Sequence, residues 1–362
     1  MRVIIMHETV TNHDAIGNDI ELMYGILRER CDCKVFALNQ FNRNVAYIDK
    51  DEMERIVDDP KLVVIYHHSV NWEYGFKLLR QIRGKIIIRY HNITPPFFFQ
   101  AYNDWHYSQC AKGRDLTETM QRALPGAYWL CDSEYNASDL TETSPGRIGI
   151  CPPFNKIEEW SRTRPDESVL KQLLESRTVN LLFVGRVAPN KGHLMMLDIV
   201  RTYCACYDAN IKLRIIGKFD ESIQKYNDLI ASTIEAYGIQ DNIEFVGEIN
   251  DSTLMAYNLG SDVMLCCSEH EGFCVPIIEA QYFGLPIVAL DSTAVPETMG
   301  PGQLCLDGDA RLFAAAIRRV VENEEYKSFL WRAGRENYRT RFSYEKVRGI
   351  FLKEFEKGLR IR

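Results

Sequence analysis

The sequence predicts an α/β protein of two domains, each built around a parallel β-sheet. The chain has 362 residues, which is enough for two hydrophobic cores of ordinary size. Apolar runs rich in Val, Ile and Leu alternate with amphipathic helical patterns in both halves, as expected for strands that are buried on both faces. A segment rich in proline and charge, 152–176, separates the halves and indicates a linker.

The first half, 1–155, is expected to form one doubly wound domain. Its first helix is predicted at 17–30, where Ile20, Met23 and Leu27 recur at helical spacing. The predicted strands are 2–7, 34–38, 62–68, 85–92, 128–133 and 147–152. The other predicted helices are 74–82, 116–124 and 134–141.

The second half repeats this plan over 179–342, after a linker region at 156–178 that includes a short helix near 169–174. The predicted strands are 180–186, 211–218, 243–248, 263–268, 286–290 and 303–306. The predicted helices are 193–207, 222–237, 252–259 and 310–322, followed by a charged helical tail at 326–359. In such sheets, ligands bind at the carboxyl ends of the strands.

Composition excludes several functional classes. The net charge of −7 gives no support for nucleic-acid binding. No signal peptide and no apolar stretch of membrane-spanning length is visible, so a cytoplasmic location is expected. The 11 cysteines include no C-x-x-C pair and are interpreted as free thiols in a reducing compartment. The sequence contains no G-x-S-x-G or H-E-x-x-H motif, which disfavours a serine hydrolase and a zincin.

The stretch 269–280 is the strongest candidate for a ligand site. It follows a short apolar strand, turns at Gly272 and enters a helix that Pro276 starts and Gly284 ends. A strand, a glycine turn and a helix start form an anion site. Glu271 and Glu279 flank that site, which suits a ligand with both phosphates and hydroxyls, such as a nucleotide sugar. The alternative is structural, because the helix dipole alone favours glutamates near a helix start.

A second candidate is the glycine-bounded loop 185–192. Arg186 and Lys191 precede a helix that begins near His193, so both cations are placed to bind a diphosphate. Solvated loop cations are the alternative. The spacing of a P-loop is absent.

A third candidate lies where the strand 85–92 ends. Arg89, His91, Asn92 and Thr94 fall at the carboxyl end of a parallel strand, where a sheet exposes its working edge. A histidine at a strand end is more often structural than catalytic. The position of His91 on the edge of a presumed cleft favours a functional role.

Three further features are open to two interpretations. His67 and His68 either line the same edge or cap a strand. The aromatic segment 97–107 is either a helix packed into the first-domain core, which we favour for its three Phe residues, or a platform for an acceptor or a membrane surface. Gly17 lets the backbone approach a ligand, although a single glycine is a weak signal.

Together, these motifs resemble the retaining GT-B glycosyltransferases of family 4, over nearly the whole chain and most strongly over 180–300. The residues that carry the resemblance are Glu271 and Glu279 of an E-x7-E motif; Gly185, Arg186, Lys191 and Gly192 of a G-R-x4-K-G loop; and His91 and Asn92 at a strand end. The resemblance implies two doubly wound Rossmann-like domains with parallel sheets facing across a cleft. The acceptor domain would be 1–155, the donor domain 179–342, and a C-terminal helix, 343–362, would cross back onto the first domain.

The resemblance also implies roles for individual residues. Arg186 and Lys191 would bind the diphosphate, Glu271 the donor sugar and Glu279 the ribose, and His91 would lie at the reacting centre. The backbone at the helix start and in the first loop would approach the donor at Gly17, Gly185, Gly272, Phe273, Cys274 and Val275. The acceptor side would comprise Arg89, Asn92, Thr94 and Arg114. Two departures from the family pattern are the single glycine of the first loop, Gly17, and Cys274 where many members have glycine.

The expected activity is therefore transfer of a mannose- or glucose-type hexose from a UDP- or GDP-linked donor to a hydroxyl of a glycan or lipid-linked oligosaccharide. The segment 91–96 and Gly113-Arg114 look like those of bacterial members that build surface polysaccharide. No metal and no cofactor is expected, and peripheral contact with the inner membrane face stays open. The alternatives are a nucleotide-sugar epimerase, a phosphorylase or a non-catalytic binding subunit.

Overall fold

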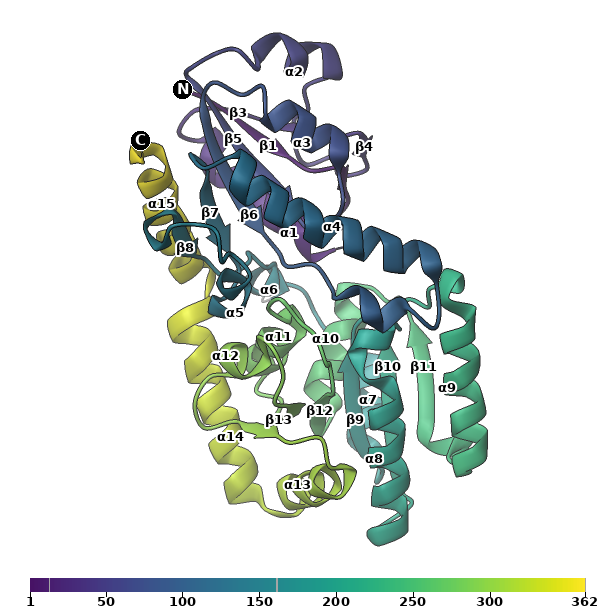
Figure 1. The fold of residues 1–362 in the computed structure, drawn as a ribbon. Coiled ribbons are helices and arrows are strands. Elements are labelled where there is room, and N and C mark those ends of the chain that lie inside the picture. The colour runs from purple at the N-terminus through teal and green to yellow at the C-terminus, as the bar shows by residue number, and fades with distance from the viewer. Residues whose placement is uncertain (13, 161, 362) are drawn as a thin grey trace. The chain divides into compact units, whose positions relative to one another are not determined.

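The computed structural model describes residues 1–12, 14–160 and 162–361. The chain forms two compact units, which are described separately (Figure 1). Unit 1 comprises Met1–Pro96, Trp105–Lys156 and Tyr344–Arg362, and unit 2 comprises Phe97–Asp104 and Ile157–Ser343.

Unit 1 is organised around a six-stranded sheet in the order β3-β1-β5-β6-β7-β8, in which every pairing is parallel. Its strands are β1 (Arg2–Met6), β3 (Asp32–Phe36), β5 (Leu62–His68), β6 (Lys85–Tyr90), β7 (Tyr128–Cys131) and β8 (Ile148–Ile150). A small parallel pair joins β2 (Thr9–Val10) and β4 (Asn39–Gln40). The strand order reverses between β1 and β5, which places the topological switch point there.

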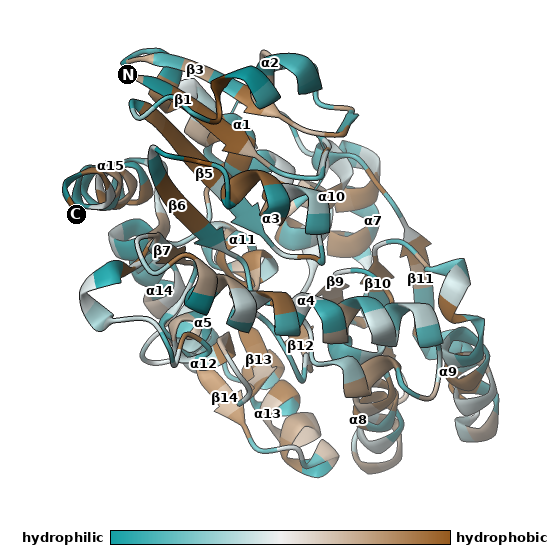
Figure 2. Ribbon diagram, turned by 45° about the horizontal axis from the view of Figure 1, so that its top comes forward, coloured by the Kyte–Doolittle hydropathy of each residue, from teal (hydrophilic) through white to brown (hydrophobic). Residues whose placement is uncertain are grey.

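Both faces of the sheet of unit 1 are buried. Successive side chains of a strand point in opposite directions, so each strand contributes to two separate cores. Val3 and Ile5 belong to one core, and Ile4 and Met6 belong to the other. The helices are α1 (Ala15–Arg28), α2 (Lys50–Ile56), α3 (Glu73–Leu79), α4 (Asp104–Ala123), α5 (Glu134–Ser138) and α15 (Tyr344–Arg360). Figure 2 shows β5 and β6 as hydrophobic along most of their length, as expected for strands buried on both faces.

Unit 2 repeats this architecture with the sheet order β11-β10-β9-β12-β13-β14, again with parallel pairing throughout. Its strands are β9 (Val179–Val184), β10 (Ile211–Ile216), β11 (Ile243–Gly247), β12 (Val263–Cys266), β13 (Ile287–Leu290) and β14 (Leu304–Leu306). The switch point of this sheet lies between β9 and β12. The prediction of two parallel α/β sheets is confirmed.

The helices of unit 2 pack around this sheet (Figure 1). They are α6 (Ile157–Trp160), α7 (Glu167–Glu175), α8 (His193–Cys206), α9 (Gln224–Tyr237), α10 (Asp251–Gly260), α11 (Val275–Phe283), α12 (Val295–Met299), α13 (Ala310–Glu322) and α14 (Glu324–Asn337). As predicted, Pro276 lies in the first turn of α11, and Gly284 ends this helix with a left-handed φ of 76°.

Four features differ from the sequence-based expectation. Residues 157–178 group with unit 2 and contain α6 and α7, because Leu173 is buried in the core of that unit. Helix α4 is 20 residues long, far longer than the expected 116–124. The segment Phe97–Asp104 groups with unit 2 rather than with the first-domain core, and its Phe residues differ in burial: Phe97 is 62% exposed, whereas Phe99 is buried. The expected tail helix is interrupted by a π-helical turn at Tyr338–Phe342 between α14 and α15.

Among the described residues, no helix combines the length and the apolar character that crossing a membrane requires.

Candidate active site

Two loops of unit 2 meet at the switch point of its sheet. The loop 185–192 follows β9, and the loop 267–274 follows β12, the strand paired with β9. Asn190 joins the two loops: its backbone carbonyl accepts from the Glu269 N–H at 2.9 Å, and its side-chain amide donates to the His270 carbonyl at 3.1 Å. Both loops predicted from the sequence are therefore brought together at the edge where α/β sheets bind ligands.

Gly192 allows this close approach. It has a left-handed φ of 69°, and a Cβ added there would lie 1.9 Å from the Cys267 carbonyl oxygen. A residue with a side chain would strain the backbone and also clash with the neighbouring loop. Glycine at this position therefore allows the turn before α8 to pack directly against the end of β12.

Lys191 and Glu271 form an ion pair across the two loops. Lys191 Nζ lies 2.5 Å from Glu271 Oε1, and the two side chains are only 18% and 12% exposed. Burial opposes the charge of Lys191, but the Glu271 carboxylate outweighs that effect and raises the lysine pKa. The sequence motifs that contain these two residues thus converge on one charged contact.

Arg186 lies at the start of the same loop and is exposed. Within the described parts of the chain, its guanidinium has no hydrogen bond or ion pair. A planar cation left without a partner beside a buried lysine can accept an anionic ligand in a bidentate manner.

The N-terminus of α11 is open for hydrogen bonding. Its N-cap residue, Cys274, has a left-handed φ of 74° and makes no side-chain capping bond. Acidic or amide side chains cap four other helices of the same unit, α7, α10, α13 and α14, whereas α8, α9 and α12 have no side-chain cap either. An uncapped helix start offers N–H groups and a positive dipole end to an anion.

Glu279 lies on α11, eight residues after Glu271. Burial, with a smaller contribution from Asp251, raises its pKa to about 7. The carboxyl group is therefore partly protonated at neutral pH in the ligand-free protein.

This pKa predicts a pH dependence of stability. A carboxyl group whose pKa is higher in the folded state stabilises the fold at low pH and loses that contribution as pH rises through the folded-state value. We expect the free energy of unfolding to fall by up to about 3 kcal/mol between about pH 4.5 and pH 8, relative to the Glu279→Gln variant. Urea unfolding of both proteins across this range measures the difference, and parallel pH profiles would contradict the expectation.

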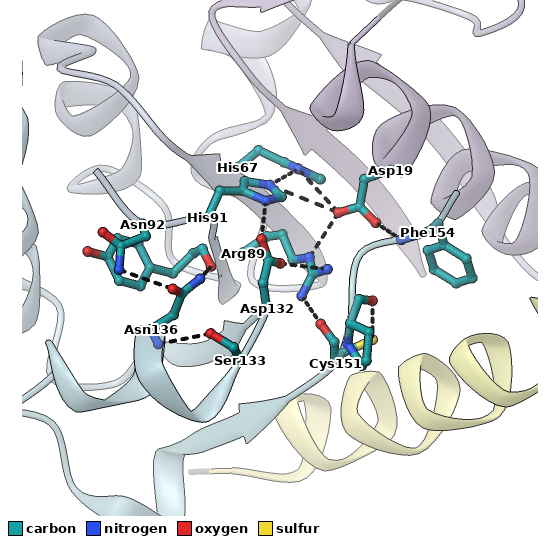
Figure 3. A network of polar contacts seen from close by, with 12 residues as sticks. Asp19, His67, Arg89, His91, Asn92, Asp132, Ser133, Asn136, Cys151 and Phe154 are labelled. Atoms are coloured by element: carbon teal, nitrogen blue, oxygen red, sulfur yellow. Dashed lines mark hydrogen bonds and ion pairs between the residues drawn. The ribbon is translucent and has the colours of Figure 1, made fainter. Parts of the chain in front are cut away.

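In unit 1, His91 lies directly after β6 within a buried polar network (Figure 3). His91 Nδ1 is 2.9 Å from Asp132 Oδ2, and His91 Nε2 is 2.8 Å from His67 Nδ1. The His91 side chain is 7% exposed and that of Asp132 is 6% exposed. Both ring nitrogens of His91 therefore face protein groups.

Arg89 forms the centre of this network and is fully buried. Its Nε donates to Asp19 Oδ2 at 2.9 Å, its Nη2 lies 2.8 Å from Asp132 Oδ1, and its Nη1 donates to the Cys151 carbonyl at 2.6 Å. Burial opposes the charge, yet Asp132 and Asp19 raise the pKa of Arg89. The placement of Arg89 on an accessible acceptor side is therefore wrong, because its guanidinium is enclosed by protein groups.

Three other predicted acceptor-side residues lie around the segment after β6. Asn92 is buried with a left-handed φ of 67°, and its amide donates to Asn136 Oδ1 at 3.0 Å. Arg114 donates to the Ile93 carbonyl at 2.9 Å, so it braces this segment. Thr94 is half-buried.

Gly17 has a structural explanation. A Cβ at this position would lie 2.1 Å from the Thr11 carbonyl oxygen, so α1 can pack against the first loop only if glycine is present. The Gly17 N–H donates to Asp14, the N-cap of α1. Asp19, two residues later, enters the network of Arg89.

The neighbouring histidines are neutral. Burial lowers the pKa of His7 to about 4 and that of His68 to about 3, and it lowers the pKa of His67 well below the ordinary value. His68 bonds Thr117 of α4 at 2.8 Å within the core, so it does not line the sheet edge. Asp19, His67 and His91 could together hold a metal ion, since their ligand atoms lie within 4.8 Å of one another. Arg89, however, already occupies Asp19 Oδ2.

Two functional candidates were missed by the sequence motifs. Asp132 and Asp19 bind the polar cluster at the end of β6, although neither belongs to a recognisable motif. Asp132 directly follows β7, so its place at the carboxyl end of the next strand was a usable signal. Asp19 lies within a helix, and its inward orientation could not be read from its spacing.

Comparisons with known proteins show similarity to glycosyltransferases. Residues 167–337 match the family described as "Glycosyl transferases group 1". An uncharacterized 41.2 kDa protein in the cps region of Klebsiella pneumoniae is 26% identical over 250 residues, which are 67% of this chain and 64% of that protein. The phosphatidyl-myo-inositol mannosyltransferase of Mycobacterium leprae is 27% identical over 183 residues, which are 49% and 46% of the two chains. The matched region thus spans less than two thirds of the length of either relative.

Among solved structures, HepE of Anabaena in complex with UDP and glucose superimposes with a TM-score of 0.76 at 14% identity. The match covers 98% of this chain and 99% of that one. Residues 167–337 therefore resemble a glycosyltransferase group 1 domain, and the chain has the GT-B fold.

Proposed function

We propose that this protein transfers a hexose from a nucleoside diphosphate sugar to a hydroxyl group, with retention of the anomeric configuration. The observation that carries the proposal is the Lys191–Glu271 ion pair at the switch point between β9 and β12. One loop supplies a cation and the other a carboxylate, as a ligand with both phosphates and sugar hydroxyls requires. Transfer of a hexose is supported by the Mycobacterium relative, a mannosyltransferase, and by the HepE structure, which binds UDP and glucose.

In this proposal, the donor binds along the loops of unit 2. Lys191 and Arg186 contact the diphosphate, together with the open N-terminus of α11 near Cys274. Glu271 accepts hydrogen bonds from hydroxyls of the hexose, and Glu279 from those of the ribose. The backbone from Gly272 to Val275, and Gly185 in the other loop, lets the donor approach closely.

The reaction breaks the bond between the anomeric carbon and the diphosphate oxygen, and it forms a bond between that carbon and the acceptor oxygen. The acceptor proton leaves on the diphosphate or to solvent. Negative charge grows on the leaving diphosphate, and preorganised cations and helix N–H groups stabilise it. Lys191, Arg186 and the start of α11 supply this charge without a metal ion.

The proposed acceptor is a hydroxyl of a glycan or a lipid-linked oligosaccharide in surface polysaccharide synthesis, in the cytoplasm or at the inner membrane face. His91, Asn92, Thr94 and Arg114 belong to the unit proposed to bind it. Because Arg89 is enclosed, it serves this unit by holding Asp132 rather than by touching the acceptor.

A ligand panel tests the donor assignment. UDP, GDP and their hexose derivatives are added singly, and the melting temperature is recorded. A ligand at 100 times its Kd stabilises the folded state by about 2.7 kcal/mol. We expect one nucleotide series to raise the melting temperature of the wild type and to have a much smaller effect on Arg186→Ala. The control is Arg201→Ala, an exposed arginine of α8 that pairs with Asp198. An unchanged response of Arg186→Ala would remove this residue from the diphosphate site.

A further inference from the structure

The His91 network contains groups whose purpose the proposed donor site does not explain. Inside unit 1, two histidines and two aspartates lie around Arg89, near the carboxyl ends of neighbouring strands (Figure 3). His67 is the penultimate residue of β5, His91 follows β6 and Asp132 follows β7. Parallel pairing brings these three positions to the same edge of the sheet.

The hydrogen-bond partners of His91 indicate which of its ring nitrogens carries the proton. An ionised carboxylate only accepts hydrogen bonds, so the contact of 2.9 Å between Asp132 Oδ2 and His91 Nδ1 requires a proton on Nδ1. The other oxygen of Asp132 faces the Arg89 guanidinium at 2.8 Å, which fixes the plane of the carboxylate.

His67 determines whether the other ring nitrogen of His91, Nε2, donates or accepts a hydrogen bond. Its Nδ1 lies 2.8 Å from His91 Nε2, while its own Nε2 is buried and has no hydrogen-bond partner among the described residues. A proton on His67 Nε2 would be an unsatisfied buried donor, whereas a proton on Nδ1 is bonded by His91. Burial keeps His67 neutral, with a single ring proton to place. The consistent arrangement is that His67 Nδ1–H donates to His91 Nε2.

The supporting groups are themselves fixed. Asp19 accepts from Arg89 through Oδ2 and from the Phe154 N–H through Oδ1, at 2.9 Å and 2.8 Å. The His7 ring lies 3.0 Å from the His67 carbonyl through Nδ1. This enclosure leaves His91 one orientation and one tautomer before any ligand binds.

We propose that Asp132 and His67 are positioning residues that hold His91 in the Nδ1–H tautomer for the proposed transfer reaction. The inference rests on the proposed function for its catalytic consequence and on the geometry of unit 1 for the tautomer itself. Any ligand group that bonds His91 Nε2 has to replace His67 there. The network therefore fixes the orientation of the His91 ring. It also determines how much free energy a ligand needs to replace His67 at Nε2.

The tautomer is tested directly by NMR. Protein labelled with ¹⁵N-histidine is examined by long-range ¹H–¹⁵N correlation, and the His91 signals are identified by their loss in His91→Gln. We expect His91 to carry its proton on Nδ1 in the wild type and to show a different or mixed tautomer in Asp132→Asn. The control is Glu354→Gln, which changes the carboxylate that accepts from the Tyr128 hydroxyl in the same unit. A His91 proton on Nε2 in the wild type, or an unchanged tautomer in folded Asp132→Asn, overturns the proposal.

Kinetics test the consequence for transfer. Loss of a hydrogen bond that orients a functional histidine commonly costs about 10–100-fold in metal sites, and we expect a similar loss of kcat in Asp132→Asn with little change in the donor KM. His67→Asn puts an amide nitrogen near the place of Nδ1 and should retain most activity, whereas His67→Leu should lose it. Equal activity of the two His67 variants contradicts a positioning role, even if Asp132→Asn does not fold. Absent transfer in the wild type would sink the proposed function but leave the NMR result valid.

Discussion

Replacement of Lys191 with methionine is expected to lower turnover by about 10²–10³-fold while the protein stays folded. Methionine keeps an aliphatic stem in the half-buried position but removes the charge that faces Glu271 at 2.5 Å. The transition state would then lose a cation directed at the leaving diphosphate, and Glu271 would lose the partner that fixes its orientation. Release of nucleoside diphosphate under saturating donor measures the effect on kcat.

A matched control separates this role from a general effect of charge. Lys171→Met removes another lysine of unit 2, whose ion pair with Glu175 is exposed and 3.8 Å long. Exposed pairs of this kind contribute at most about 1 kcal/mol, so activity should be unchanged. Equal turnover of Lys191→Met and the wild type would contradict the diphosphate assignment.

Replacement of Gly192 with alanine is expected to destabilise the protein by about 2–5 kcal/mol and to abolish nucleotide binding. Its φ of 69° disfavours a side chain, and the new Cβ would lie 1.9 Å from the Cys267 carbonyl oxygen. Relief of this clash requires the two donor loops to separate, which would break the Lys191–Glu271 contact next to it. Chemical unfolding gives the stability change, and calorimetric titration gives the binding.

Gly238→Ala is the control for this experiment. Gly238 has nearly the same φ of 65° at the end of α9, but a Cβ there meets no atom within 4 Å. It should therefore show only the backbone strain, about 1–2 kcal/mol, and should bind nucleotide normally. If both alanine variants had the same stability and the same affinity, contact between the loops would not be the reason for glycine at 192.

Most of the fold was predictable because the central strands of both units are buried on both faces. Continuous apolar runs such as that of β5 leave little choice but a parallel sheet covered by helices. The predicted boundaries of elements and domains were wrong where the local composition was ambiguous. The polar first half of α4 has no clear apolar stripe, so its extent was underestimated. The segment Phe97–Asp104 groups with unit 2 through contacts such as that of Tyr102 with Tyr226, which no local pattern reveals.

The candidate site likewise has a part that the sequence predicted and a part that it did not. The donor loops are local motifs, so Lys191 and Glu271 could each be identified from the sequence, although their ion pair could not. The network around His91 is assembled from several separate stretches of chain, and its members Asp19 and Asp132 have no motif of their own. Arg89 shows the limit clearly: position at a strand end predicted an accessible residue, but the side chain turns inward because two carboxylates bind it.

The central claim is retaining transfer from a nucleoside diphosphate hexose, and proton NMR of a single reaction tests it most directly. The purified protein is incubated with the nucleotide sugar that raises its melting temperature and with a glycan acceptor, while the anomeric signals are followed. The account predicts release of nucleoside diphosphate that depends on acceptor, and a product with the anomeric configuration of the donor. A product with inverted configuration, or a donor that is bound but never consumed, would contradict it.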